Sequence, residues 1–331
     1  MADLTRLLSA LRDAAVAPAT RITYTKQLSA FLNYSDITPQ QLVSLDAADL
    51  DLQLAHYIAY LHSTGRSYTH ASHALNGLVF QRPEMRLRLG ISHQALRGWG
   101  RLKPTRSYPP ITWELTVLFA VLLAREGHHA PAVGLLLAFD CYLRVSEMTR
   151  IRYCDVVMPN DPRTGQAYTG MAVALPLTKT GLNQWVTIKD PAVGDILLDH
   201  IARRSPQSTD NDRVFPFTPA RFRRLLTLAS VAAGVGYSHY VPHSLRHGGA
   251  TADFLRGVTI EQIMFRGRWK GMESARRYLQ TGRAMLAAQR VPLALNQLGI
   301  ILDQHIVYIM HYFFSSVEVS EPQPRKQVRF L

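Results

Sequence analysis

The segment at residues 103–110 constrains the fold of this 331-residue chain more than any other feature of the sequence. It reads Lys-Pro-Thr-Arg-Ser-Tyr-Pro-Pro, and adjacent prolines in a basic, polar stretch interrupt helices and are typical of linkers. A chain of this length is too long for one small core and long enough for two domains. We therefore place a domain boundary there, between a first domain at 1–102 and a second domain that begins at 111.

The first domain is expected to be helical throughout. Its apolar side chains recur at intervals of three and four residues, which is the period of a helix with one buried face. The stripes comprise Leu4, Leu7, Leu8 and Leu11, then Tyr24, Leu28, Phe31 and Leu32, then Leu54, Tyr57, Ile58 and Leu61, and a last run over 68–80. Gly65 and Pro83 end the third and fourth stripes.

The second domain is predicted to combine helices with a β-hairpin. Thr112 is the expected N-cap of its first helix. Helices are predicted at 113–126, 130–139, 192–203, 219–233, 244–255 and 260–265. Met171, Val173 and Leu175 alternate with smaller residues, residues 184–188 form a second strand, and residues 180–183 supply the turn between them. The fold class is therefore mainly α with a small β-hairpin.

The charge of the chain is strongly positive. Lys and Arg number 37 against 24 for Asp and Glu, a net charge of +13, and only six of the 37 are lysines. A guanidinium is a planar fork of donors that suits phosphate, so nucleic acid is the favoured partner and a basic surface kept for solubility is the alternative. The candidate nucleic-acid contacts of the first domain are Arg21, Lys26, Arg66, Tyr68 and His70. The alternative interpretation is that these residues belong to ordinary solvated helix faces.

Cysteine usage and hydropathy predict a soluble intracellular protein. Cys141 and Cys154 have neither metal-site nor redox spacing, and both are expected to be inert core thiols in a reducing compartment. The first residues lack the basic-then-apolar pattern of a secretion signal. The apolar run at 298–314 is interrupted by Asp303 and by histidines, and it is short for a membrane span.

The most informative stretch for chemistry is Pro-His-Ser-Leu-Arg-His-Gly-Gly-Ala-Thr at 242–251. On a helix, His243 and Arg246 lie three residues apart and point to the same side. An imidazole that moves protons beside a guanidinium that holds anionic oxygens is what a phosphoryl-transfer site needs. An isolated His-x-x-Arg is common, so its meaning depends on the rest of the chain.

Three other places supply that context. Arg144 stands one helical turn before Glu147, which can orient it through an ion pair, and Lys179 is expected at the tip of the hairpin. Trp269 and Tyr278 follow the His-x-x-Arg pair. Each of these features alone has a simpler interpretation. Arg144 and Glu147 could be a routine ion pair at a helix start, Lys179 a solvated turn residue, and the two aromatics part of the core.

Together, and in this order, the residues resemble the signature of the tyrosine recombinase (phage integrase) family: Arg, a hairpin Lys, His-x-x-Arg, His or Trp, and a nucleophilic Tyr. The matching positions are Arg144, Lys179, His243, Arg246, Trp269 and Tyr278. Two intervals also fit, 269 − 246 = 23 and 278 − 269 = 9. The resemblance covers residues 112–285, and the run at 243–251 is most similar to recombinases of eukaryotic mobile elements. Trp stands at 269 where His is the commoner residue of the family.

The resemblance implies a two-domain architecture. It places a helical core-binding domain that contacts DNA at 1–102, a linker at 103–110, a mixed α/β catalytic domain at 111–290 and a C-terminal segment at 291–331. The helices of the first domain match the family more loosely. The implied partner is double-stranded DNA, bound by a homo-tetramer on paired sites, without a cofactor, a metal, a membrane or a small-molecule substrate. The protein would then be DNA-associated, in the nucleus if it comes from a eukaryotic mobile element and in the cytoplasm or nucleoid otherwise.

The resemblance also implies a role for each matched residue. Arg144 and Arg246 clamp the non-bridging phosphate oxygens. Tyr278 is the nucleophile, and because a phenol with a pKa of about 10 is a weak one, the cationic site and His243 assist the loss of its proton. Lys179 protonates the departing 5′ oxygen, and the indole N–H of Trp269 donates to phosphate.

Two alternatives to a recombinase remain at this point. A type IB topoisomerase shares the tyrosine chemistry and a similar set of site residues, although the two-domain length and the N-terminal helices favour a recombinase. The other alternative is a mobile-element remnant that binds DNA without cutting it. The intact state of all six matched positions argues against this alternative.

The C-terminal segment has two readings of its own. Its predicted helical stripe consists of Leu298, Leu302, Ile306, Ile309 and Phe313, which is more apolar surface than a lone surface helix leaves in water. The stripe docks either on a neighbouring subunit or back on its own domain.

Overall fold

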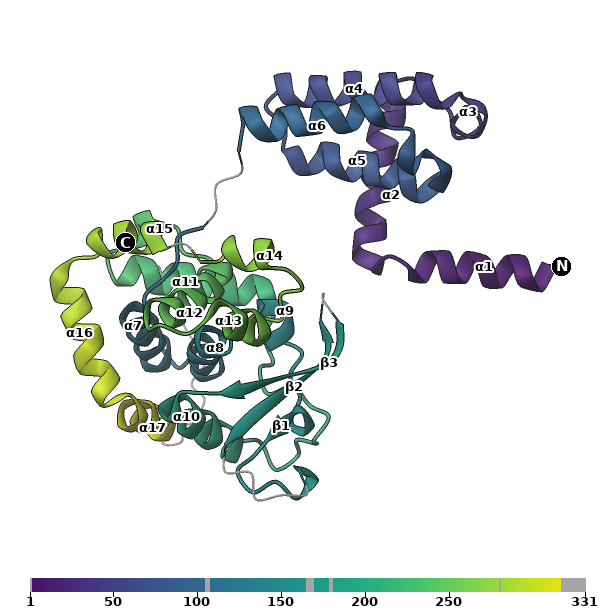
Figure 1. Cartoon of the computed structure of the whole chain (residues 1–331). Coiled ribbons are helices and arrows are strands. Elements are labelled where there is room, and N and C mark those ends of the chain that lie inside the picture. Colours follow the sequence, from purple (N-terminus) through teal and green to yellow (C-terminus); the bar gives the residue numbers. More distant parts are fainter. Residues whose placement is uncertain (1, 105–107, 165–169, 179–180, 280, 317–331) are drawn as a thin grey trace, which may run out of the picture. The chain divides into compact units, whose positions relative to one another are not determined.

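The computed structural model describes residues 2–104, 108–164, 170–178, 181–279 and 281–316. The chain divides into two compact units, Met1–Arg106 and Ser107–Leu331. Helices dominate both units, and the strands that the structure describes belong to the second (Figure 1).

The first unit is a bundle of helices. Its elements are α1 (Ala2–Ala14), α2 (Pro18–Tyr34), α3 (Pro39–Ser44), α4 (Ala47–Ser63), α5 (Tyr68–Gln81) and α6 (Gly90–Leu102). The side chains of Thr38, Asp46 and Ser67 accept hydrogen bonds from backbone N–H groups in the first turns of α3, α4 and α5, and so define where these helices begin. The carboxylate of Asp51 accepts from the backbone N–H groups of Ile91 and Ser92, which fixes α4 to the start of α6.

The core of the first unit is built from the predicted stripes of α2, α4 and α5. Phe31, Leu54, Ile58 and Leu78 are fully or almost fully buried there. The stripe of α1 is different, because its helix forms but its four leucines are 55–71% exposed. The reason is that α1 extends away from the bundle and meets it only near its C-terminal end, where Arg12 donates to the last carbonyls of α5.

The second unit contains the remaining helices and a small sheet. Its helices are α7 (Trp113–Arg125), α8 (His129–Asp140), α9 (Val145–Met148), α10 (Pro191–Ala202), α11 (Pro219–Ala232), α12 (Pro242–Leu255), α13 (Ile260–Gly267), α14 (Met272–Arg276), α15 (Thr281–Gln289), α16 (Leu293–Gln304) and α17 (Ile306–Ser316). The helices predicted from periodicity are confirmed, with bounds that differ by a few residues. Thr112 caps α7 as expected, accepting a hydrogen bond from the N–H of Leu115.

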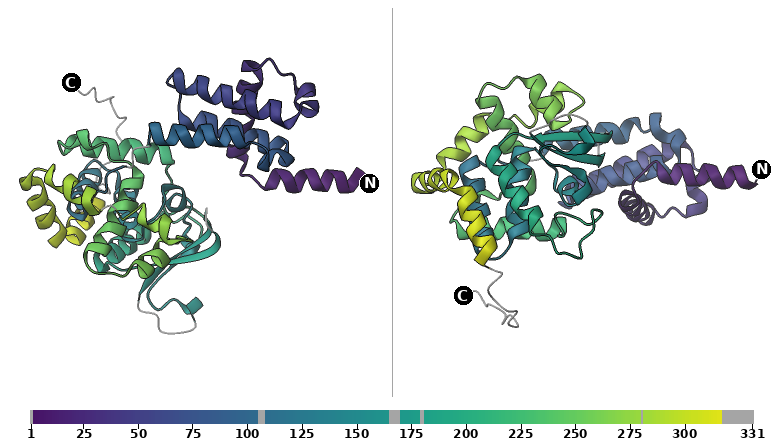
Figure 2. Two further views of the ribbon diagram at one scale, coloured as in Figure 1. Left: turned by 45° about the horizontal axis from the view of Figure 1, so that its top comes forward. Right: turned by 90° about the horizontal axis from the view of Figure 1, so that it is seen from below.

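The sheet has three antiparallel strands in the order β1-β2-β3, at one side of the helices of the second unit (Figures 1 and 2). They are β1 (Val156–Val157), β2 (Met171–Thr178) and β3 (Gly181–Ile188), and Val173 lies opposite Val186. The predicted hairpin is confirmed, but its turn is shorter than predicted, since residues 181–183 already belong to β3. The additional strand β1 is too short to produce a readable alternation in the sequence.

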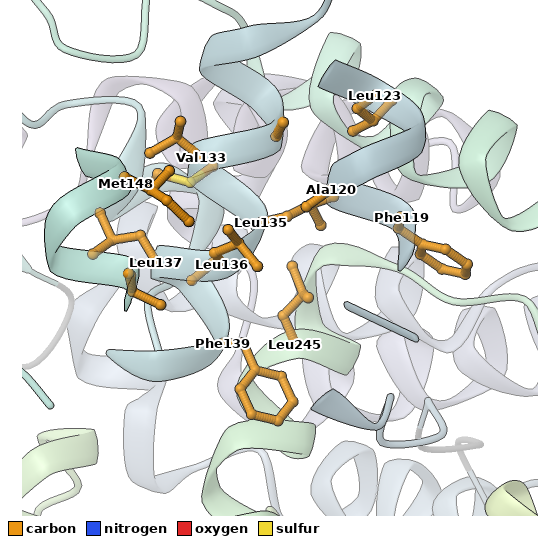
Figure 3. Packing of buried hydrophobic residues seen from close by; sticks show 14 of the residues in the cluster. Phe119, Ala120, Leu123, Val133, Leu135, Leu136, Leu137, Phe139, Met148 and Leu245 are labelled. Carbon is orange, nitrogen blue, oxygen red and sulfur yellow. The ribbon is translucent and has the colours of Figure 1, made fainter. Parts of the chain in front are cut away.

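The core of the second unit forms around α7 and α8, which are apolar on every side. Leu135, Leu136 and Leu137 of α8 are all fully buried, so this helix is surrounded by other elements. Figure 3 shows Leu245 of α12 among Leu136 and Phe139 of α8. The helix that carries the His-x-x-Arg pair is thereby attached to the best-packed part of the unit.

The part of the C-terminal segment that the structure describes, up to residue 316, packs on its own unit. Helix α16 lies along α7, where a Cβ added to Gly299 would stand 2.6 Å from the Glu114 carbonyl oxygen, so glycine permits this close contact. Helix α17 lies against α10 and α7 and buries Ile306, Met310 and Phe314. The predicted stripe is not continuous, because the chain bends by 78° between α16 and α17. Of its residues, Ile306 is buried, Leu302 and Phe313 are partly buried against the core, and Leu298 is exposed.

No single helix in the described part of the chain is long and apolar enough to cross a membrane. Helices α16 and α17 pass that test only as a bent pair, on length and composition alone.

The two cysteines differ from each other. Cys141 is buried as predicted, whereas Cys154 is exposed, so the prediction of a core thiol is wrong for Cys154. Cys154 lies in a short 3-10 turn at 153–155 just before β1, and its side chain is exposed although Ile151 and Val156 on either side of the turn are buried.

Candidate active site

Two glycines allow α12 to lie close to its neighbours. A Cβ added to Gly248 would stand 2.2 Å from the carbonyl oxygen of Ile111, and one added to Gly249 would stand 2.1 Å from that of Phe139. No side chain fits at either position, so the Gly-Gly pair after the His-x-x-Arg motif is needed for the backbone packing. This packing fixes where Arg246, two residues earlier on the same helix, enters the interior.

Aromatic rings gather around the side chain of Arg246. Its guanidinium carbon lies 4.7 Å from the ring centroid of Trp269 and 5.3 Å from that of Tyr278. The Trp269 and Tyr278 rings are themselves 4.7 Å apart, and the ring of His243 lies 6.1 Å from that of Tyr278. Residues from α12, from the segment after α13 and from the turn after α14 therefore form one cluster.

The guanidinium of Arg246 donates hydrogen bonds to two backbone carbonyl oxygens. One of its terminal nitrogens donates to the carbonyl oxygen of Tyr142, and the other donates to that of Gly267 at 2.5 Å. The side chain has no exposed surface. Solvent therefore does not reach this guanidinium in the structure.

A buried carboxylate connects the arginines of the cluster. Glu147, 3% exposed, accepts from the side chain of Arg144 and, at 2.9 Å, from the backbone N–H of the same residue at the start of α9. A terminal nitrogen of Arg268 lies 3.0 Å from the Oε2 atom of Glu147. A terminal nitrogen of Arg246 lies 3.9 Å from the same oxygen. Glu147 thus orients Arg144, as predicted, and holds Arg268 as well.

The electrostatics of the cluster suit an anion. Burial opposes ionisation of Glu147, but the charges of Arg268, Arg144 and Arg246 and the N–H of Arg144 outweigh it and lower the pKa of Glu147. Burial, together with the charges of Arg144 and Arg268, lowers the pKa of Arg246. Three guanidiniums share one carboxylate, so the cluster has an excess of positive charge that a bound phosphate would neutralise.

Several buried donors in this cluster have no hydrogen-bond partner among the described residues. They are Nε of Arg246, Nε of Arg268 and the indole Nε1 of Trp269. Buried polar groups are normally satisfied, so each unsatisfied one calls for an explanation, such as a water, an ion or a catalytic role. This is consistent with the hydrogen bond from Trp269 to phosphate that the resemblance implies.

Five of the six predicted residues come together in this way. Arg144, His243, Arg246, Trp269 and Tyr278 lie in one cluster of the second unit. Lys179 lies outside the described residues, and what the structure describes is the end of β2 directly before it.

Three residues of the cluster were not predicted. His247 stacks on the ring of Tyr278 with 4.6 Å between centroids, Tyr142 offers its carbonyl to Arg246, and Arg268 binds Glu147. The position of His247, one turn after His243, is a sequence signal for the same helix face. No pattern in the sequence distinguishes Arg268 from the other arginines around it, because its burial depends on residues more than a hundred positions away.

The candidate DNA contacts of the first unit lie on its helices and on the turn before α5. Lys26 and Arg66 are exposed, and Tyr68 and His70 are half-buried. Arg21 is paired with Asp13 across 2.8 Å. The Tyr68 ring meets Trp99 edge to face at 5.7 Å, so it also has a packing role.

No group of three or more His, Cys, Asp or Glu side chains in the described residues has the geometry to hold a metal ion.

Comparison with known proteins shows the fold. No family model and no curated protein matches the sequence. Among solved structures, the chain is similar to the XerH site-specific recombinase bound to a palindromic difH substrate in a post-cleavage complex, with a TM-score of 0.54, 16% sequence identity, and coverage of 81% of this chain and 78% of that one. It is also similar to the Tn1549 transposon integrase in complex with circular intermediate DNA, with a TM-score of 0.51, 12% identity, and coverage of 81% and 98%.

A second complex of the Tn1549 integrase, with transposon right end DNA, gives a TM-score of 0.52 at 13% identity. The chain therefore has the tyrosine recombinase fold, which confirms the predicted architecture of a helical protein with a small antiparallel sheet.

Proposed function

We propose that this chain is a site-specific tyrosine recombinase that cleaves and rejoins DNA through a 3′-phosphotyrosine intermediate. The observation that carries the proposal is the contact of the Tyr278 ring with the buried Arg246 guanidinium, beside Arg144 and His243. A lone aromatic on an arginine is ordinary packing. A tyrosine among two arginines and a histidine, in the fold of site-specific recombinases, has the groups that phosphoryl transfer needs.

The chemistry follows from these groups. The Tyr278 oxygen attacks phosphorus while its proton passes to His243, and the bond from phosphorus to the 5′ oxygen breaks. Arg144 and Arg246 stabilise the negative charge that builds up on the non-bridging oxygens. The 3′ phosphate remains on the tyrosine, and attack by a 5′ hydroxyl of another strand reverses the sequence. The phosphotyrosine retains the energy of the broken bond, so rejoining needs no ATP.

Lys179 is the proposed acid that gives a proton to the departing 5′ oxygen. Support comes from the family resemblance and from its position in the sequence, directly after the last residue of β2. Lys189 at the other end of the hairpin is a weaker candidate, because its ammonium already donates to Asp253 across 3.1 Å.

The proposed partner is double-stranded DNA, bound by a homo-tetramer on paired sites. The net charge of +13 and the exposed Lys26 and Arg66 support contacts to the phosphate backbone by the first unit, together with Arg21, Tyr68 and His70. The similar structures of the XerH recombinase and the Tn1549 integrase are of those proteins bound to DNA. In the cell, the protein would be found associated with DNA.

Covalent attachment tests the proposal directly. The protein is incubated with a library of nicked duplexes in EDTA, and the adduct is trapped, digested and mapped by mass spectrometry. We expect an adduct on Tyr278 that Tyr278→Phe abolishes and that Tyr237→Phe leaves intact, since Tyr237 is an exposed tyrosine bonded to the Arg290 carbonyl. An adduct on another residue, or strict dependence on Mg²⁺, would refute the mechanism.

The same preparation separates a recombinase from a topoisomerase. A recombinase is expected to exchange strands only between two copies of its site in a multi-subunit complex. Relaxation of any supercoiled plasmid by a monomer would favour the topoisomerase alternative, and DNA binding without an adduct would favour the non-catalytic remnant.

A further inference from the structure

We infer that Arg268 is a positioning residue that sets the orientation of both catalytic arginines, because its guanidinium shares one acceptor with each of them. The shared acceptors are the carboxylate of Glu147, which also binds Arg144, and the carbonyl oxygen of Tyr142, which also binds Arg246. The inference rests on the proposed function and adds to it a residue outside the matched signature.

The first half of the arrangement is the carboxylate. Arg144 takes Oε1 of Glu147 and gives its backbone N–H to Oε2, while Arg268 donates to Oε2 at 3.0 Å. Glu147 and Arg268 are each 3% exposed at the side chain, whereas Arg144 is 15% exposed. The buried ion pair of Glu147 and Arg268 is therefore the fixed part, and Arg144 is the member that reaches toward the surface.

The second half is the carbonyl of Tyr142. Arg268 donates to it at 3.2 Å from the same nitrogen that donates to Glu147. Arg246, on α12, donates to the same carbonyl oxygen. Tyr142 and Arg268 have φ angles of +47° and +57°, in the left-handed region that residues with a side chain rarely adopt. Such backbone persists only where the surroundings hold it, and here the hydrogen bonds of Arg268 hold both positions together.

Only arginine meets these requirements. The other terminal nitrogen of Arg268 donates to the carbonyl of Arg266 at 3.0 Å, so the two arms of the fork reach acceptors on both sides. A lysine has a single ammonium on a flexible stem and cannot repeat this planar arrangement. A neutral side chain would leave the Glu147 carboxylate with a smaller share of positive charge, and Arg144 would lose its fixed reference.

Arg266 provides a matched control two residues away. It is also a buried arginine, it also pairs with a buried carboxylate, that of Asp140 at 3.1 Å, and it also donates to main-chain carbonyls. It binds neither Glu147 nor the Tyr142 carbonyl in the described contacts. Arg266→Gln and Arg268→Gln therefore remove the same chemical group from similar depths. They differ in their contacts: the Arg266 guanidinium lies over the Tyr142 ring, 5.4 Å from its centroid, whereas Arg268 donates to the Tyr142 carbonyl and to Glu147, which are acceptors of Arg246 and Arg144.

The experiment compares Arg268→Gln, Arg268→Lys and Arg266→Gln in the full chain, on the nicked DNA that gives the Tyr278 adduct. Melting temperature, DNA affinity and the adduct-forming rate at saturating DNA are measured for each. We expect Arg268→Gln to slow adduct formation roughly 10- to 100-fold at nearly unchanged affinity, since small misplacements of catalytic groups cost rates of this order. Arg268→Lys should recover part of the rate, and Arg266→Gln should keep it while losing comparable thermal stability.

A double variant tests whether Arg268 acts through Glu147. Glu147→Gln with Arg268→Gln should lose no more rate than the slower of the two single variants, because the two changes disable one unit. Losses that multiply, or a wild-type rate in Arg268→Gln, would overturn the inference. If Arg268→Gln does not fold, Arg268→Lys decides: a folded protein with the wild-type rate counts against positioning, and a slower one at unchanged affinity supports it. Failure of the wild-type protein to form a Tyr278 adduct would refute the proposed function itself, which is a different result.

Discussion

The guanidinium carbon of Arg246 lies 5.3 Å from the centroid of the Tyr278 ring, and the Arg246 side chain has no exposed surface. Tyr278, the proposed nucleophile, thus also helps to bury Arg246, which is proposed to bind the phosphate. This links chemistry and stability at one residue, and the two can be separated by substitution.

Tyr278→Phe keeps the ring over Arg246 and removes only the reacting oxygen. We expect it to leave the free energy of unfolding nearly unchanged. Tyr278→Ala removes the ring as well and should lower the stability by about 1–2 kcal/mol, the scale of a desolvated cation–π contact. Chemical denaturation of both variants measures the difference, and equal stabilities would show that the ring does not protect Arg246.

Lys179→Ala should slow cleavage of ordinary DNA much more than cleavage of DNA with sulfur at the 5′ bridging position, because a thiolate leaves without a proton. Lys189→Ala is the control, since Lys189 is occupied by Asp253. Rates on both substrates are compared for each variant. Equal losses on both substrates for Lys179→Ala would mean that another group is the acid.

The exposed cations of the first unit should account for part of the salt dependence of DNA binding. Replacing Arg66 by Ala is expected to make the slope of log affinity against log salt shallower by about 0.9, the contribution of one phosphate contact. Arg21→Ala should change the slope less, because Arg21 is already paired with Asp13. Titrations at several salt concentrations provide the slopes, and an unchanged slope for Arg66→Ala would remove it from the DNA contacts.

The C-terminal helix α17 should contribute to the stability of the free protein. Met310 lies on the buried face of this helix and is fully buried, so Met310→Ala is expected to lower the free energy of unfolding by about 2–4 kcal/mol. Tyr308→Ala, on the exposed side of the same helix, is the control and should change little. Unfolding curves that coincide for all three proteins would indicate that α17 is not docked on its own unit in solution.

The contact of α17 with its unit should weaken in acid. Burial lowers the pKa of His129, assisted by the charges of His200 and Arg203, and burial also lowers that of His200; both rings lie against Phe314. A histidine with a depressed pKa in the folded state stays neutral there, while the unfolded chain takes up protons below its usual value of about 6.5. Stability is therefore complete above that pH and falls as the pH drops through it.

Melting temperatures between pH 7.5 and pH 5 measure this loss, and His129→Phe should reduce its slope because the ring contact remains and one titrating group is gone. An identical slope in the two proteins would assign the acid sensitivity to other groups.

Much of the site was readable from the sequence because its chemistry is carried by residue types in a fixed order. The helical placement of His243 and Arg246 follows from local spacing, and so does the pairing of Arg144 with Glu147. Trp269 and Tyr278 could be identified only through their intervals from Arg246. The exposed leucines of α1 and the bend before α17 were missed, because periodicity reports that a helix has an apolar face but not whether anything covers it.

The sequence by itself determined the helical elements and the hairpin, since each depends on neighbours within a few turns of the chain, and it contains the residue types for phosphoryl transfer in a fixed order. Only the tertiary structure decided that Arg246 is enclosed, that Arg268 joins Glu147 and that the C-terminal helices fold back on their own unit. These features arise from contacts between residues that are distant in the chain, from 21 positions for Arg246 and Gly267 to 121 positions for Arg268 and Glu147. Their energies depend on which surfaces meet, and local spacing in a sequence holds no record of that.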